Sequence, residues 1–83
     1  MNILAVFSNR THTLAFQQFL MSAGIYCAVI STPKSTNLPC GICVKFAESS
    51  FILAKKVAPK YTSFTGFYTY DYNSKNYKKL SRN

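Results

Sequence analysis

The sequence predicts an α+β protein with the ferredoxin-like order strand, helix, strand, strand, helix, strand, in which an antiparallel sheet carries two helices on one face. Three observations support this prediction: four strand-like apolar runs, two segments with helical apolar spacing, and the position of each helical segment between two strands. No repeat or linker interrupts this order. We therefore expect one domain in residues 1–72 and a basic tail in residues 73–83, whose order the sequence leaves open.

The N-terminal half supplies the first three elements. Residues Asn2–Phe7 form a nearly continuous apolar run, which is typical of a central strand. From Thr11 to Ala23 apolar residues recur at helical spacing, and Gly24 supplies a common helix stop. Residues Tyr26–Ile30 are rich in β-forming residues, so we expect a second strand there.

The C-terminal half supplies the other three. In Ile42–Phe46 large apolar residues occupy alternate positions, which predicts a strand with one buried face. A second helix is expected from Ser49 or Ser50 to Ala58, where Pro59 ends it. Residues 63–72 read S-F-T-G-F-Y-T-Y-D-Y, a β-rich segment that predicts the last strand.

The charge of the chain is strongly positive. Ten basic residues stand against only Glu48 and Asp71, which gives a formal net charge of +8. This balance favours an anionic partner such as nucleic acid, an acidic protein or a phosphorylated small molecule. The scarcity of carboxylates argues against acid–base catalysis by paired carboxylates, so we expect that the chain is not an enzyme.

No segment of the sequence reads as a membrane or secretion signal. No apolar run approaches the roughly 20 residues that span a bilayer, and the apolar run Ile3–Phe7 is too short for a secretory signal. Three cysteines cannot form a complete disulfide framework, because an odd number leaves one unpaired. We therefore expect a cytoplasmic protein with free thiols and no membrane partner.

The polar segment between the second and third strands carries the most suggestive chemistry. Pro33 and Pro39 restrict this loop, which delivers Cys40 and Gly41 to the entrance of the third strand. A right-handed crossover would place the loop at the same end of the sheet as the start of the first helix. Gly41 would let the backbone approach a ligand closely.

Three basic side chains would then lie near the thiol of Cys40. They are Arg10, His12 and Lys34. Positive charges and free helix N–H groups lower the pKa of a cysteine and make its thiolate a nucleophile. The sequence therefore makes Cys40 the candidate reactive group, with these side chains and Gly41 stabilising its thiolate or a bound anion.

Several short motifs occur in a fixed order along this part of the chain: Thr11-His12, Ala23-Gly24-Ile25, Ser31-Thr32-Pro33-Lys34, Cys40-Gly41 and Lys45-Phe46. Together they resemble the Se/S carrier-like family of small bacterial proteins, over roughly Ile3 to Phe46 and more weakly through Gly66-Phe67-Tyr68. The most specific part is a proline and a basic residue followed, after five residues, by Cys-Gly.

The resemblance implies a carrier whose cysteine holds sulfur or selenium as a persulfide or perselenide, with a donor and an acceptor protein as partners. In this chain that role would fall on Cys40. Two features depart from the family pattern. Lys34 stands where the family usually has arginine, which removes a bidentate anion contact, and Cys43 and the tyrosine-rich basic tail are additional.

Redox and metal chemistry are weaker alternatives. Cys40 and Cys43 have C-x-x-C spacing, but residues three apart on a strand point to opposite faces. Adding His12 and Cys27 would complete a zinc set, yet only one pair has ligand-like spacing. We therefore expect no metal and no cofactor, with Cys27 and Cys43 as ordinary strand residues.

The last strand and the tail suggest rival functions. Tyr68, Tyr70 and Tyr72 would share one face of the strand, and the tail adds Lys75, Lys78 and Lys79. Aromatic and basic residues on an open sheet face can stack single-stranded RNA, although the third strand lacks an RNA-binding signature. The same face could pair with a second copy in a homodimer or dock on an acidic protein, and the sequence leaves these alternatives open.

Overall fold

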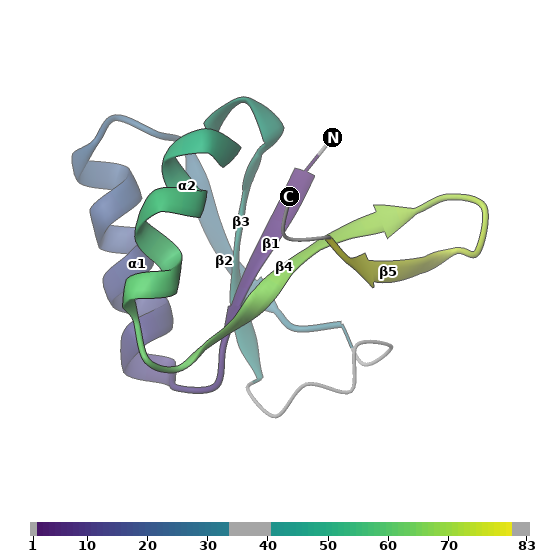
Figure 1. The fold of residues 1–83 in the computed structure, drawn as a ribbon, viewed down its shortest axis with the longest axis horizontal. Coiled ribbons are helices and arrows are strands. Elements are labelled where there is room, and N and C mark those ends of the chain that lie inside the picture. The colour runs from purple at the N-terminus through teal and green to yellow at the C-terminus, as the bar shows by residue number, and fades with distance from the viewer. Residues whose placement is uncertain (1, 34–40, 81–83) are drawn as a thin grey trace.

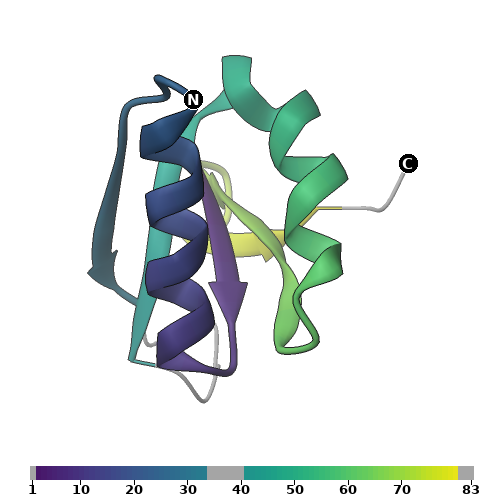
Figure 2. The same cartoon turned by 90° about the vertical axis from the view of Figure 1, so that its left-hand side faces the viewer.

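The computed structural model describes residues 2–33 and 41–80 and shows one sheet with two α-helices on one of its faces (Figure 1 and Figure 2). The elements in chain order are β1 (Asn2–Phe7), α1 (Arg10–Ser22), β2 (Cys27–Ser31), β3 (Ile42–Ala47), η2 (Glu48–Ser50), α2 (Phe51–Val57), η3 (Ala58–Lys60), β4 (Phe64–Asp71) and β5 (Asn76–Lys79). The elements η2 and η3 are single 3₁₀ turns that flank α2. Neither described helix has the length and apolar character needed to cross a membrane.

The sheet is antiparallel throughout, with the strand order β2-β3-β1-β4-β5. The predicted α+β class with an antiparallel sheet is confirmed. The number of strands, and with it the strand order, differs from the predicted four-stranded unit, because residues 76–79, placed in the basic tail by the sequence, form β5, which is added beside β4. The β4–β5 hairpin extends the sheet away from the helices (Figure 1).

The main core lies between the sheet and the helices. Phe7 is its centre: ring centroids of Phe16, Phe64 and Tyr61 lie 5.3, 5.4 and 5.5 Å from its own. The fully or almost fully buried residues of this core are Ile3, Ala5, Phe7, Phe16, Leu20, Val44, Phe46, Ala54, Ala58 and Phe67. Alternate residues of the central strands therefore face the helices, as the period of a strand requires.

The opposite face of the central strands is also buried. Leu4, Val6 and Cys43 are at most 1% exposed and form a second cluster, against which Ile30, Tyr68 and Tyr77 pack. The prediction that residues 42–46 have a single buried face was therefore wrong. Alternation in the sequence identified the helix-facing side chains, but cysteine, a small apolar residue, fits a core on the other face equally well.

Local signals fix both ends of α1. The side chain of Asn9 accepts a hydrogen bond from the backbone N–H of His12 at 3.1 Å, which caps the start of the helix. At the other end Gly24 has a φ of +80°, and the N–H of Ile25 donates to the carbonyl of Leu20 at 2.9 Å. This left-handed glycine turns the chain back towards β2.

Candidate functional site

The end of β2 and the start of β3 lie at the end of the sheet where α1 begins (Figure 1). The backbone N–H of Thr32 donates to the carbonyl of Gly41 at 2.9 Å, so the two described ends of the loop are held together. Gly41 is exposed, and a Cβ built on it would meet nothing within 4 Å. No described residue therefore crowds Gly41 at this end of the sheet.

Two predicted site residues of this loop, Lys34 and Cys40, lie outside the described residues. Arg10 is the first residue of α1 and is exposed. In residues 2–33 and 41–80 the one ion pair joins Lys78 and Asp71, which leaves the guanidinium of Arg10 without an acidic partner there. Arg10 thus remains available to an anion at the start of α1.

His12 contacts the segment that precedes β4. Its Nδ1 lies 2.7 Å from the Oγ of Ser63, and its ring centroid lies 5.3 Å from that of Tyr61. The structure gives the imidazole a hydrogen-bond partner and an aromatic neighbour that join α1 to the start of β4. The predicted role of His12 beside the Cys40 thiolate stays a prediction, because Cys40 lies outside the described residues.

The two described cysteines are poorly placed for thiolate chemistry. Cys43 is fully buried in the second cluster. Cys27 is half-buried against α1, its Sγ lies 3.7 Å from the backbone carbonyl oxygen of Gln17, and burial raises the pKa of its thiol. A buried, protonated thiol is a weak nucleophile, so neither side chain competes with Cys40 for a reactive role.

The described residues contain no group of three or more side chains arranged to hold a metal ion. Of the zinc set considered from the sequence, His12 is engaged with Ser63 and Cys27 with the carbonyl of Gln17. The two side chains therefore lie in different places: His12 is at the start of α1, and Cys27 is beside the middle of that helix.

The tyrosines gather on the sheet face opposite the helices. Tyr68 pairs with Lys79 and Tyr70 with Tyr77 across the hairpin. Tyr70, Tyr72 and Tyr77 line a hollow of about 220 Å³ together with Asn2, Leu4 and Lys45. Sequence reasoning missed Tyr77, because it lay in the presumed tail, and Lys45, although its position two residues after Cys43 already placed it on that face.

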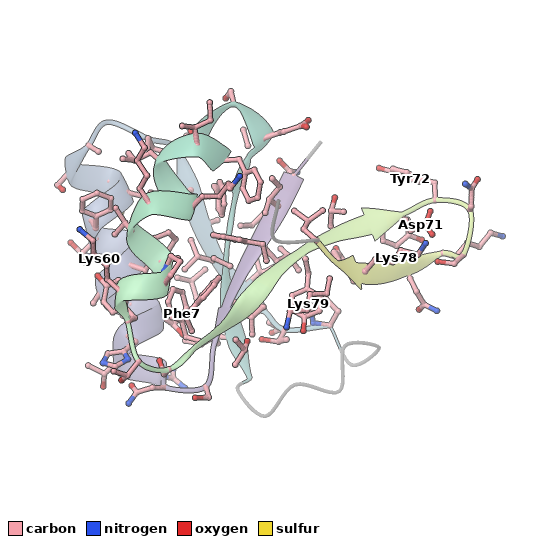
Figure 3. The ribbon with its side chains drawn as sticks, in the orientation of Figure 1. Phe7, Lys60, Asp71, Tyr72, Lys78 and Lys79 are labelled. Carbon is pink, nitrogen blue, oxygen red and sulfur yellow. The ribbon has the colours of Figure 1, made fainter. Side chains whose placement is uncertain are left out.

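Lys78 and Lys79 of the hairpin lie on opposite faces of the sheet. Lys78 pairs with Thr69, and its Nζ lies 3.1 Å from the Oδ2 of Asp71 (Figure 3). Lys79 is the cross-strand neighbour of Tyr68 and so shares the tyrosine side of the hairpin. Lys75 lies at the turn with a φ of +59°.

Comparison with known families gave one match. A family model described as "Putative Se/S carrier protein-like" matches residues 2–68. Searches of curated proteins and of solved structures found no match. The matched segment includes the loop between β2 and β3 and ends within β4, before the hairpin turn.

Proposed function

We propose a carrier function for this chain, which belongs to the Se/S carrier protein-like family, with the thiol of Cys40 as the group that holds the cargo. The observation that carries the proposal is the family match over residues 2–68, which spans the Pro-Lys and Cys-Gly motifs of the loop. The cargo is a sulfur or selenium atom bound to Cys40. Because the role needs a free thiol, we place the protein in a reducing compartment such as the cytoplasm.

Elimination among the cysteines supports this assignment. Cys43 is buried on one side of the sheet, and Cys27 is a half-buried thiol of raised pKa on the other. A carrier must take its cargo from one protein and present it to another, so its cysteine has to be accessible to both partners. Cys40, beside the exposed Gly41, is the cysteine whose position in the chain suits that role.

The expected loading step needs no external oxidant, because the sulfur atom is transferred from one thiol to another. The Cys40 thiolate attacks the outer sulfur of a donor persulfide, a new S–S bond forms on Cys40, and the donor's S–S bond breaks. The donor leaves as a thiolate and takes up one proton. A second thiolate, on the acceptor, then removes the outer sulfur from Cys40 in the same way.

The surroundings proposed for the thiolate are Arg10, Lys34 and the start of α1. The exposed Arg10 and the closed loop ends lie at one end of the sheet, which supports this choice. His12, bound to Ser63, is the weaker candidate of the original set. The carrier would act without acid–base catalysis of its own, since Glu48 and Asp71 are the only carboxylates and Asp71 is bound to Lys78.

The experiment is persulfide loading followed by intact-mass spectrometry. The chain is incubated with a small-molecule persulfide, and a mass gain of one sulfur atom is expected. Cys40→Ser should abolish the gain, whereas the matched control Cys27→Ser should keep it. Equal loading of both variants, or a Cys40 thiol pKa at or above about 8.5 measured by alkylation, would contradict the proposal.

A further inference from the structure

The β4–β5 edge of the sheet carries a cluster of tyrosines in mutual contact. The ring centroid of Tyr70 lies 4.8 Å from that of Tyr72 and 5.3 Å from that of Tyr77, at interplanar angles of 76° and 74°. Tyr72 is nevertheless 80% exposed. The ring of Tyr72 thus packs against that of Tyr70 while most of its surface faces water, on the face opposite the helices.

The hollow beside these rings combines three kinds of group. The tyrosines supply aromatic rings, Asn2 and Lys45 supply an amide and an ammonium group, and the buried Leu4 borders the hollow. An aromatic wall next to a cation is the arrangement that takes a nucleobase on its π-face and the adjoining phosphate on the charge.

Positive charge surrounds the cluster without acidic neutralisation. No strand residue on this face of the described sheet is acidic. Lys45 lines the hollow, and Lys79 is the cross-strand neighbour of Tyr68 on the same side. Asp71 belongs to the other side of the hairpin, where it binds Lys78. The net charge of the whole chain is +8, so a polyanion would be attracted to this surface from a distance.

We propose that this surface, made of Tyr70, Tyr72, Tyr77, Lys45 and Lys79, binds single-stranded nucleic acid. We name it the tyrosine–lysine face. Cys40 is not part of it, and the proposal does not depend on the carrier function. Stacking must occur at the edge of the sheet, because Leu4, Val6 and Cys43 are buried in the central strands and leave no open aromatic platform there.

Two other occupants fit the face less well. A second copy of the chain would bring the same lysines and another +8 of charge against this face, which disfavours a symmetric dimer. An acidic peptide would satisfy the lysines but gives no reason for an 80% exposed tyrosine ring. Duplexes hide their base faces, whereas single strands can offer bases to stack.

The test measures binding of a fluorescently labelled single-stranded oligouridylate to the full chain by anisotropy. Tyr72→Ala should weaken binding by about tenfold, since stacking of one base on an aromatic ring is worth roughly that factor. The matched control is Tyr26→Ala, because Tyr26 is 91% exposed and lies before β2, away from the face. It should leave the affinity unchanged.

A second comparison tests the lysines. Lys45→Ala should reduce the slope of log affinity against log salt by about 0.7, as expected when one phosphate contact of a single strand is lost. Lys60→Ala, at the end of η3, removes the same charge elsewhere and should not change the slope. Cys40→Ser should bind the oligonucleotide as the natural chain does, which separates this proposal from the carrier function.

Three outcomes would overturn the proposal. One is equal affinity of the Tyr72→Ala and Tyr26→Ala variants. The second is displacement of the oligonucleotide by polyglutamate of equal charge as effectively as by unlabelled oligonucleotide, which would make the face a docking surface for acidic proteins. The third is equal competition by a duplex, since stacking requires accessible bases.

Discussion

The Nδ1 atom of His12, in the first turn of α1, lies 2.7 Å from the Oγ of Ser63, which directly precedes β4. The two residues are 51 positions apart in the chain. Their contact, with the ring of Tyr61 beside it, ties the start of the helix to the entrance of a neighbouring strand. This is a tertiary link at the end of the sheet that holds the candidate carrier loop.

His12→Ala should lower the free energy of unfolding by about 1–2 kcal/mol, because it removes this hydrogen bond and an aromatic contact. A double-mutant cycle with Ser63→Ala, followed by denaturant unfolding, should give a coupling of about 1 kcal/mol. If His12 instead acted on the thiolate, its removal would raise the alkylation pKa of Cys40 and leave unfolding unchanged.

Cys27 should react with alkylating reagents slowly at neutral pH and faster only in strongly alkaline solution. Burial raises the pKa of its thiol above the ordinary value of 9.0, so the neutral form prevails in the folded chain. The stabilisation from this group is present below pH 9.0 and is lost as the pH rises through the higher folded-state pKa. Cys27→Ala should therefore flatten the alkaline fall in stability measured between pH 8 and 11.

Gly66→Ala should destabilise the fold by about 1–3 kcal/mol, because φ at this position is +153°, a conformation that residues with a Cβ rarely adopt. An added Cβ would also lie 2.6 Å from the Cε of Lys79, whose stem crosses the glycine. Gly41→Ala is the control, since its Cβ would meet no atom within 4 Å. The Gly66→Ala, Lys79→Ala double variant should recover only the steric part of the loss in thermal unfolding.

Acid should loosen the hairpin turn. Hydrogen bonds from Lys78, Ser74 and the backbone of Asn73 lower the pKa of Asp71 below the ordinary value of 3.8. The contribution of the Asp71 carboxylate to stability is complete above pH 3.8 and is lost as the pH falls through the lower pKa of the folded state. In an NMR titration the Asn73 amide should shift in step with Asp71, and Asp71→Asn should remove that shift while leaving the signals of α1 unchanged.

The sequence predicted the elements whose signals are local. Helical spacing and Gly24 located α1, and the apolar run of Asn2–Phe7 located the central strand. The buried face of α1 was only partly predicted: Thr13 lies in the core, whereas Leu14 is 42% exposed. A hydroxyl group can be buried there because it donates to the carbonyl of Asn9.

Features set by distant partners were not predictable. The segment N-Y-K-K of β5 has only one apolar residue in four and becomes a strand through pairing with β4. The contact of His12 with Ser63 and the burial of Cys43 depend equally on residues far away in the chain. The candidate carrier residues Cys40 and Lys34 remain predictions from the sequence and the family.

The short strand β5 also determines how the sheet ends. One side of β5 pairs with β4, and its other side is a free edge of the sheet. Edge strands invite pairing with other chains through their unpaired backbone groups. β5 is only four residues long and two of them are lysines, both of which discourage such addition. Without it, the aromatic second half of β4, residues 68–71, would lie at the edge, so β5 protects that part of the chain against edge-to-edge aggregation and fibre growth.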